Sequence, residues 1–381
     1  MDTRIEFLFL NEEDMIKAGV LDAGRCVDTV GEVMSLLSSG DYIMGGKEHN
    51  DHGVQLIFPK KSEIPDFPLA DSRDRRFMSM PAYLGGRYHL AGEKWYGSNG
   101  RNAAKGLPRS ILMVTLNDVE TGQPIAYMSA NLLSAMRTGA MPGLAALHLA
   151  RKDSKILSLI GAGVVNRTSL MAIMAKFPGI EEIRIKGSSI TSQTALELKK
   201  FTEENYLNLK SVKICGSDEE AVIGADIISE AVSVAPHMWP KIKHEWIKPG
   251  CLIISSGTIE VDYEFTKNHI TKVVDNIGMY EEYIKVYQEY DKNGKPISMG
   301  TPGLDYVNMI TEGAIKKEEV QNLGAIVRGI EPGRTREDEI IMISLGGMPI
   351  LDVGCGYECY KKAMEEGIGT KLKLWDSPFL A

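Results

Sequence analysis

The chain has 381 residues, of which 44% are hydrophobic and 25% are charged, as in a folded globular protein with a sizeable core. Its net charge of −8 and the lack of a basic stripe argue against nucleic acid as a partner. No apolar run approaches the roughly 20 residues of a membrane span, and the charged first residues lack a signal-peptide core.

The five cysteines are scattered, and an odd number without the spacing of a disulfide framework indicates reduced thiols. We therefore expect a cytoplasmic protein. Cys355 and Cys359 are one helical turn apart, but no other Cys or His lies near them in the sequence, so we expect them to pack in the core. His49 and His52 have no identifiable third ligand, so the sequence predicts no metal site.

The first 150 residues begin with a short strand, followed at Asn11 by a helix start, because Asn is a good N-cap and acids favour the positive end of a helix. A helical pattern covers 27–37, and residues 42–75 are polar and irregular. Alternating apolar residues then predict an antiparallel meander that leads into a long helix. The expected strands are 7–10, 77–84, 88–90, 91–96, 110–116 and 124–128, and the helix is 129–150.

The stretch 155–177 is arranged as a strand, a glycine turn and a helix. Ile156–Ile160 has strand length, Gly161-Ala162-Gly163 is the turn, and a helical pattern follows. Such a turn lets backbone N–H groups approach a pyrophosphate at the positive end of the helix. A dinucleotide-binding fingerprint would have a third glycine at the position of Asn166. The alternative is a tight strand-to-helix turn that binds no ligand.

Residues 155–278 alternate strands with helices, which predicts an α/β fold with a doubly wound parallel sheet. Ligands of such sheets lie beyond the carboxyl ends of the strands, where the Gly161 turn is. A last strand at 340–345 and a helix at 352–366, ended by Gly367, follow later in the chain. The expected strands of the repeat are 156–160, 182–185, 211–214, 227–231, 251–255 and 272–274, with helices that include 191–205 and 218–224.

Three cationic side chains are candidates for substrate chemistry. Lys94 ends a strand of the meander and would donate a hydrogen bond or move a proton if burial lowers its pKa; the alternative is a surface lysine. Arg137 lies in an apolar helix, so it needs a partner, either a substrate carboxylate or an internal salt bridge. Lys47 lies in the polar loop, where it offers a cation to a carboxylate unless that loop is simply solvated.

The end of the strand at 182–185 bears on the choice of cofactor. A site selective for NAD has Asp or Glu here to bind the ribose 2′-hydroxyl, and this chain has Gly187. Because Lys186, Ser188 and Ser189 flank that position and no acid is present, the segment tolerates a 2′-phosphate. The sequence therefore favours NADP over NAD.

Several short motifs follow one another in a specific order. They are Gly92-Glu-Lys-Trp95, Gly106-Leu-Pro-Arg109, Leu116-Asn-Asp118, Ser134-Ala-Met-Arg-Thr138, Gly161-Ala-Gly163, Glu245-Trp-Ile-Lys-Pro-Gly250, Asp275 and the segment 346–369. Together they resemble the ornithine cyclodeaminase/mu-crystallin family. The resemblance implies a homodimer, with a substrate-binding and dimerisation domain made of residues 1–150 and 340–381 and a Rossmann domain at 151–339.

Members of that family move a hydride between a nicotinamide and the α-carbon of an amino acid or imine. By the resemblance, Lys94 matches the catalytic lysine that contacts the substrate, and Arg137 matches the arginine that binds its carboxylate. Lys47 is the candidate for a second cation at that carboxylate. The cofactor-binding residues that the resemblance implies are Thr138, Gly161, Gly163, Val164, Val165, Lys186, Ser188, Ser189, Ala231 and Val232.

This chain departs from the family pattern in three places. The arginine of the first domain that helps to clamp the carboxylate has no clear match, and Lys47 is the candidate to replace it. The usual Gln after the glycine turn is Val165, and the aspartate expected after the strand that ends near Ser255 is missing. The loss of that acid argues against ornithine cyclisation, unless Glu260 or Asp262 reaches the site. The stretch 94–109 looks closest to the opine-type branch, whose members make or split an amino acid joined to a keto acid.

We therefore expect an NAD(P)-dependent oxidoreductase that acts on an amino-acid C–N bond. One alternative is ornithine cyclodeaminase itself, which forms proline and ammonia with no net change in the redox state of the cofactor. An alternative of another class is a crystallin-like protein that binds its ligand without turnover.

Overall fold

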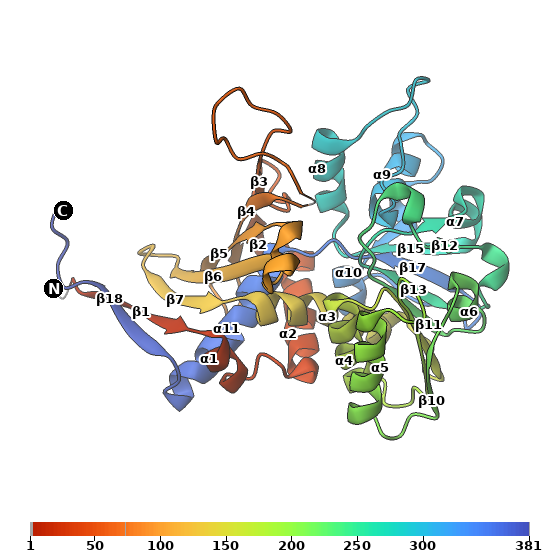
Figure 1. The fold of residues 1–381 in the computed structure, drawn as a ribbon, viewed down its shortest axis with the longest axis horizontal. Helices are drawn as coiled ribbons and strands as arrows, with labels where there is room; N and C mark the ends of the chain where they lie inside the picture. Colours follow the sequence, from red (N-terminus) through yellow and green to blue (C-terminus); the bar gives the residue numbers. More distant parts are fainter. Residues whose placement is uncertain (1–2, 73, 381) are drawn as a thin grey trace. The chain divides into compact units, whose positions relative to one another are not determined.

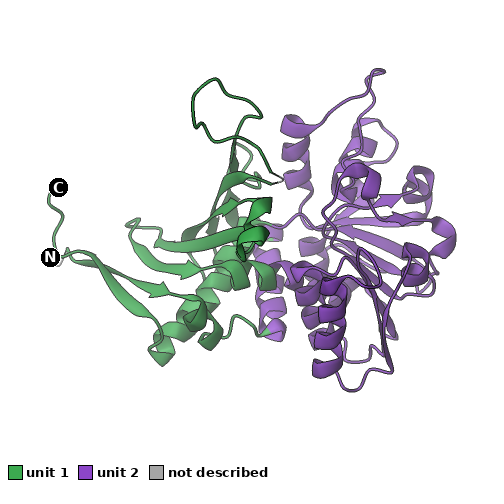
Figure 2. Ribbon diagram, in the orientation of Figure 1, with its two compact units in different colours: residues 1–22, 39–137, 348–381 green, residues 23–38, 138–347 purple. Residues whose placement is uncertain are grey.

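The computed structural model describes residues 3–72 and 74–380. The chain divides into two compact units, shown in Figure 2. Unit 1 contains Met1–Asp22, Ser39–Arg137 and Met348–Ala381, and unit 2 contains Ala23–Ser38 and Thr138–Gly347. Helix α3 (Asn131–Leu149) begins in unit 1 and ends in unit 2. Each unit therefore combines segments that are far apart in the sequence.

Unit 1 is built on an eight-stranded sheet with the order β18-β1-β7-β6-β5-β4-β2, and β3 pairs with β4. The pairs are antiparallel except for β1 with β7. Because β1 pairs with β18, the first and last strands lie side by side (Figure 1). The strands are β1 (Ile5–Leu10), β2 (Tyr42–Met44), β3 (Val54–Ile57), β4 (Arg76–Leu84), β5 (Leu90–Ser98), β6 (Ser110–Asp118), β7 (Pro124–Ser129) and β18 (Thr370–Trp375).

One face of this sheet packs against helix α11 (Pro349–Glu366), which contacts β4, β5 and β6. By register, Met80, Lys94 and Val114 lie side by side on neighbouring strands, and all three are buried. The helix ends at Gly367, whose φ of +67° is the left-handed conformation that glycine adopts most easily. The core of unit 1 therefore lies between α11 and the strands that carry Lys94 and its neighbours.

Unit 2 contains a second eight-stranded sheet, in the order β10-β9-β8-β11-β13-β17-β15-β16, in which neighbouring strands are parallel. The strand order reverses between β8 and β11, as in a doubly wound sheet. A separate short pair joins β12 to β14. The strands are β8 (Ile156–Ile160), β9 (Glu182–Lys186), β10 (Ser211–Ile214), β11 (Ile227–Glu230), β12 (Lys241–Ile242), β13 (Leu252–Ser255), β14 (Glu260–Val261), β15 (Ile270–Val274), β16 (Val320–Asn322) and β17 (Ile340–Ser344).

Helices supply most of the connections between the parallel strands, as such connections require. No helix among residues 3–72 and 74–380 is long and apolar enough to cross a membrane. The remaining helices are α1 (Glu12–Lys17), α2 (Ala23–Ser39), α4 (Val164–Lys176), α5 (Gln193–Asn205), α6 (Asp218–Val222), α7 (Tyr263–His269), α8 (Ile277–Tyr287), α9 (Pro302–Thr311) and α10 (Leu323–Val327), with 3-10 turns at Gly100–Lys105, Pro236–Met238, His244–Trp246 and Lys317–Glu319.

The predicted α/β class and doubly wound parallel sheet are confirmed. The compact units differ from the boundaries expected near 150 and 340. Strand β17 pairs with β13 and β15, so residues 340–344 belong to the parallel sheet of unit 2, which also contains most of α2 and the second half of α3. Short strands in the polar segment, β2 and β3, were not predicted, and neither was β16.

Gly143 of α3 is expected to be required by packing. A Cβ there would lie 2.8 Å from both Ala172 Cβ and Val27 Cγ2. Alanine gains roughly 1 kcal/mol of helix propensity, but overpacking a core costs about 1–3 kcal/mol. We therefore expect Gly143→Ala to lower the free energy of unfolding by up to about 2 kcal/mol in urea denaturation followed by circular dichroism.

The control for this substitution is Gly179→Ala, whose new Cβ would meet only Lys155 Nζ at 3.7 Å. Its free energy of unfolding should stay within about 0.5 kcal/mol of the wild-type value. A Gly143→Ala protein as stable as this control would show that the core around α3 adjusts without cost.

Candidate active site

Three charged side chains meet in the core of unit 1. Lys94 of β5 lies with its Nζ 2.9 Å from Oδ2 of Asp352, and Arg137 of α3 lies with its Nε 3.0 Å from the other carboxylate oxygen. The relative exposures of Lys94, Arg137 and Asp352 are 3%, 5% and 0%. One buried carboxylate thus neutralises only one of two buried cations, and the cluster is positively charged when all three groups are ionised.

Local packing explains how the carboxylate reaches β5. Strand alternation turns Lys94 to the buried face of the sheet, and Asp352 lies in the apolar first half of α11. A Cβ on Gly92 would lie 2.6 Å from the Thr115 carbonyl oxygen and 3.0 Å from Val353 Cγ2. The lack of a side chain at residue 92 therefore lets α11 approach β5 closely enough to bring the carboxylate to the lysine.

The pKa of Lys94 is lowered to about 8 in this position. Burial is the main cause, repulsion from Arg137 adds to it, and Asp352 opposes both. Ser134 Oγ is a further partner, 3.5 Å from the lysine Nζ. A lysine with such a pKa is a much better proton donor and acceptor near neutral pH than an exposed one.

Arg137 keeps part of its hydrogen-bonding capacity. Its Nε donates to Asp352, whereas its two terminal amino groups donate to no residue among 3–72 and 74–380. These terminal groups suit a planar carboxylate, which binds an arginine fork through two parallel hydrogen bonds. The structure therefore contains the internal ion pair, one of the two partners expected for Arg137, and binding of a substrate carboxylate remains a prediction.

Lys47 forms no hydrogen bond or ion pair with Lys94, Arg137 or Asp352. It is exposed on the turn between β2 and β3, a turn that an isolated bridge between Gly45 and Asp51 closes. Its proposed part in binding a carboxylate remains a prediction.

The glycine turn of unit 2 connects β8 to α4 as predicted. Gly161 has a φ of +94°, and a Cβ there would lie 2.7 Å from the Ala231 carbonyl oxygen and 3.0 Å from Val232 Cγ2. Gly163 is the N-cap of α4, with open space around its Cα, and Val164 after it is 65% exposed. The start of α4 therefore presents unobstructed backbone, the arrangement that suits a pyrophosphate.

Asn166 explains how the turn is held without a third glycine. Its side chain is fully buried, and its Nδ2 lies 2.8 Å from the Ile160 carbonyl oxygen and 2.7 Å from that of Gly161. Its Oδ1 accepts a hydrogen bond from Ser229 Oγ at 2.8 Å. The amide thus connects β8, the turn and β11, so its polar atoms have partners in the core.

Sequence reasoning missed Glu230, a buried acid at the carboxyl end of β11. Its carboxylate accepts hydrogen bonds from Val232 N, from Ser255 Oγ at 2.9 Å and from Gly257 N at 3.2 Å. Burial raises the pKa of Glu230 to about 7, against the effect of these donors. The residue lies beside Ala231 and ties the ends of β11 and β13 together. An acid within an otherwise apolar strand was the available signal.

The two acids considered as replacements for the missing aspartate have other roles in this structure. Glu260 forms an ion pair with Lys241 at 3.0 Å, and Asp262 is the N-cap of α7, with its Oδ1 2.7 Å from Phe265 N. The acid nearest the end of β13 by hydrogen bonding is Glu230. These contacts do not support the alternative, left open by the sequence, that Glu260 or Asp262 takes the place of the aspartate.

A second buried acid, Asp275, lies at the end of β15. It accepts hydrogen bonds from the backbone N–H groups of Gly346 and Gly347 at 2.8 and 3.2 Å, and burial raises its pKa. Buried carboxylates thus hold loops at the carboxyl edge of the parallel sheet, the edge at which doubly wound folds bind ligands.

The end of β9 lacks an acid, as the sequence indicated. A Cβ on Gly187 would lie 2.9 Å from Ala195 Cβ, so packing against α5 favours glycine at this position. Lys186 Nζ donates to the Gly187 carbonyl oxygen at 2.7 Å, and Ser188 and Ser189 are exposed. Thr138, another predicted cofactor residue, is half-buried on α3.

Within residues 3–72 and 74–380, no group of three or more His, Cys, Asp or Glu side chains is placed to hold a metal ion. The five cysteines are buried, and none of them forms a disulfide bond.

The pattern of the ornithine cyclodeaminase/mu-crystallin family matches residues 23–367. The chain is 29% identical to the N-((2S)-2-amino-2-carboxyethyl)-L-glutamate dehydrogenase of Staphylococcus aureus over 377 residues, which cover 97% of this chain and 99% of that protein.

Two solved structures are similar over almost the whole chain. One is the Δ1-pyrroline-2-carboxylate reductase of Thermococcus litoralis in complex with NADH and L-proline. It matches this chain with a TM-score of 0.74 and 26% sequence identity, and the matched region covers 96% of this chain and 99% of the reductase chain. The other is an archaeal alanine dehydrogenase dimer with bound NAD. It matches this chain with a TM-score of 0.74 and 26% sequence identity, and the matched region covers 97% of this chain and 100% of the dehydrogenase chain.

The lowered pKa of Lys94 predicts a pH-dependent stability. Between pH values of about 8 and 10.5, the folded protein has lost the Lys94 proton while the unfolded chain still binds it. Stability rises with pH wherever the unfolded state binds more protons. In urea denaturation, the wild-type protein should therefore gain stability relative to Lys94→Met across this window, by roughly 3 kcal/mol at most.

The matched control is Lys61→Met, which removes an exposed lysine and should follow the wild-type protein across the same window. If the stability of the wild type relative to Lys94→Met stays constant or falls as the pH rises, burial does not lower the pKa of Lys94.

Proposed function

This chain belongs to the ornithine cyclodeaminase/mu-crystallin family, and from that premise we propose that it is a nicotinamide-dependent oxidoreductase that exchanges hydride with the α-carbon of an amino acid or of its imine. The observation that carries the proposal is the buried cluster of Lys94, Arg137 and Asp352. Two cations around one carboxylate leave a net positive charge for an anionic substrate, and their burial makes each contact stronger than it would be in water.

The three residues have distinct roles in this proposal. The free terminal amino groups of Arg137 bind the substrate carboxylate. Lys94 hydrogen-bonds the substrate nitrogen or carbonyl oxygen and, with a pKa of about 8, gives or takes the proton that accompanies the change at that atom. Asp352 holds both cations in place, so the substrate meets a fixed arrangement of charge.

The cofactor is assigned to the turn between β8 and α4. Gly161 lets Ala231 and Val232 close over the turn, and the exposed start of α4 at Gly163 and Val164 offers backbone donors to a pyrophosphate. Bound there, the nicotinamide supplies or accepts the hydride. Because Val165 stands where the family has Gln, its side chain offers no hydrogen bond to the cofactor, and the pyrophosphate is bound by backbone N–H groups. Lys186, Ser188 and Ser189 are assigned to the ribose, where a 2′-phosphate fits, so NADP(H) is preferred over NAD(H).

The substrate is assigned to the opine type, a secondary amine that joins an amino acid to a keto acid. Support comes from the likeness to the Staphylococcus aureus dehydrogenase, which extends over 97% of this chain. Ornithine cyclisation is disfavoured because Glu260 and Asp262 are engaged elsewhere in unit 2. Release of ammonia from ornithine without a change in reduced-nicotinamide absorbance would favour the cyclodeaminase instead.

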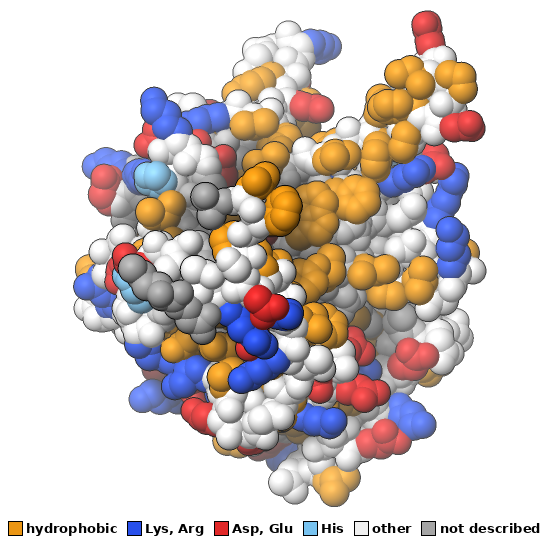
Figure 3. Space-filling model, turned by 90° about the vertical axis from the view of Figure 1, so that its left-hand side faces the viewer, with side chains coloured by type: hydrophobic (Ala, Val, Ile, Leu, Met, Phe, Trp, Pro, Cys, Tyr) orange, Lys and Arg blue, Asp and Glu red, His pale blue; other side chains and the backbone are white. Residues whose placement is uncertain are grey.

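We further propose a homodimer formed through the sheet of unit 1. Phe77, Trp95 and Ile111 are 39%, 39% and 49% exposed, and the first two rings stack with centroids 5.7 Å apart. On the side drawn in Figure 3, hydrophobic side chains gather into a contiguous area. Apolar areas of this kind mark interfaces, and the similar alanine dehydrogenase is a dimer. A monomeric mass in sedimentation equilibrium would contradict the proposal.

Arg137→Ala should raise the KM for the substrate by about 100-fold or more, because it removes two charge-assisted hydrogen bonds worth roughly 1.5–3 kcal/mol each. Arg137→Lys should restore only part of the loss, since an ammonium lacks the planar fork. Kinetics with amino acids and with keto-acid and amine pairs, followed by reduced-nicotinamide absorbance, give both values.

The control is Arg101→Ala, which removes an arginine whose side chain is 61% exposed in the same unit and should leave KM unchanged. An unchanged KM in Arg137→Ala would remove the assigned role of this residue, and no turnover with any substrate of the panel would count against the proposed function.

Ser188→Asp should shift the choice of cofactor toward NADH. The new carboxylate repels a 2′-phosphate and accepts a hydrogen bond from a ribose 2′-hydroxyl. We expect the ratio of kcat/KM for NADPH to that for NADH to fall at least tenfold, about 1.4 kcal/mol. Leu207→Asp, at a site 84% exposed, makes the same charge change away from β9 and should leave the ratio unchanged. Equal ratios in the two variants would contradict the assignment.

A further inference from the structure

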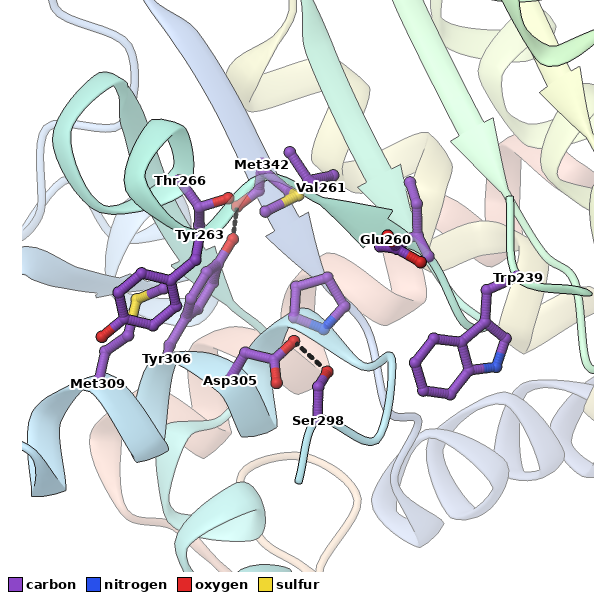
Figure 4. Close-up of a pocket in the computed structure, with 12 residues that line it drawn as sticks. Trp239, Glu260, Val261, Tyr263, Thr266, Ser298, Asp305, Tyr306, Met309 and Met342 are labelled. Atoms are coloured by element: carbon purple, nitrogen blue, oxygen red, sulfur yellow. Dashed lines mark hydrogen bonds between the residues drawn. The ribbon is translucent and has the colours of Figure 1, made fainter. Parts of the chain in front are cut away.

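Unit 2 contains a cavity of about 280 Å³ that the proposed chemistry does not use. Its walls come from the segment around Trp239, from β14 and α7, from the loop before α9 and from α9 itself (Figure 4). None of its lining residues is among those assigned to cofactor or substrate. The cavity therefore needs its own explanation.

The walls of this cavity are held by hydrogen bonds between separate elements. Ile259 N donates to the Gly300 carbonyl oxygen at 2.8 Å, and the Tyr306 hydroxyl donates to the Met342 carbonyl oxygen at 3.1 Å. Gly300 has a φ of +73°, and a Cβ there would lie 2.8 Å from the indole of Trp239, so the loop rests directly on that ring. The cavity is thus pre-formed, as small-molecule sites usually are.

Asp305 gives the cavity an uncompensated negative charge. Its carboxylate accepts one hydrogen bond, from Ser298 Oγ at 3.1 Å (Figure 4). No Lys, Arg or His of the chain from 3 to 72 and from 74 to 380 forms an ion pair with it, whereas the other acid in the wall, Glu260, pairs with Lys241. Burial raises the pKa of Asp305 to about 6, so the group is mostly ionised above that pH.

The rest of the lining suits a cation with an apolar body. Aromatic rings of Trp239, Tyr263 and Tyr306 face the cavity together with Met309 and Met342. The ring of Tyr263 already has a cation over it, because Lys295 Nζ lies 5.5 Å from its centroid. Aromatic faces attract ammonium groups, and methionine side chains adapt to apolar groups of varied shape.

We propose that this cavity binds a small organic amine without a carboxylate, with its ammonium group on Asp305 and its hydrocarbon part among the aromatic and methionine side chains. A free amino acid is disfavoured by the same charges, because its carboxylate would lie close to Asp305 and Glu260, and of these two acids Glu260 is the one with an ion pair, to Lys241. The site is independent of the proposed oxidoreductase activity.

The test uses the full chain labelled with 5-fluorotryptophan, in which Trp239→Phe identifies the fluorine resonance of Trp239. Titration with n-butylamine at a pH above the pKa of Asp305 should shift that resonance with an affinity at least tenfold higher than that of n-butanol, its neutral counterpart. Butyrate should not bind. Asp305→Asn, which keeps an oxygen acceptor for Ser298, should bring the two affinities close together while n-butanol still binds.

Glu260→Gln is the matched control, because this acid lines the same cavity but is already paired, and it should keep the preference for the amine. Equal affinities for amine and alcohol in the wild-type protein, or loss of the preference in Glu260→Gln alone, would overturn the proposal. If Asp305→Asn does not fold, the order of affinities for amine, alcohol and carboxylate in the wild-type protein decides it.

Discussion

The structure of unit 1 depends on the sharing of one buried carboxylate by two buried cations. Removing charges from water is expensive, and Asp352 offsets that cost for Lys94 and Arg137 only because α11 lies directly on β5. The approach in turn depends on Gly92, where any side chain would meet Val353. The charge excess that remains is the basis of the proposed binding of an anionic substrate.

The buried polar side chains that connect the strands of unit 2 are an amide and a carboxylate, whereas the buried cluster of unit 1 contains two cations. Asn166 and Glu230 each bind several backbone groups, and together they connect β8, β11 and β13 at the edge where the glycine turn lies. A buried polar network whose members are all satisfied makes its surroundings rigid. The edge of the sheet is thus held in shape by side chains that need not touch a ligand themselves.

The sequence allowed the fold class, the glycine turn and two of the three clustered residues to be predicted, because these depend on local patterns. Arg137 was unusual in an apolar helix, and Lys94 was indicated by its place at the end of a strand and by the motif that resembles the family. Asp352 looked like an ordinary helical residue, since its partners lie 258 and 215 positions away and only tertiary packing brings them together. The pairing of β17 with β13 and β15 could not be predicted for the same reason, because strands that pair over long sequence separations carry no local sequence signal of their partners.

The interleaving of the two units along the chain has a consequence for biosynthesis. Every segment of unit 2 precedes Met348, so its parallel sheet is able to assemble while the last part of the protein is still being translated. Arg137 must wait for 215 further residues before its counter-ion is made, roughly 10 to 40 s at ordinary ribosomal speeds. During that interval Lys94 and Arg137 lack the carboxylate that pairs with them in the folded protein. The cluster of Lys94, Arg137 and Asp352 is therefore completed late in synthesis, and a chain that stops before Asp352 lacks the carboxylate of the cluster.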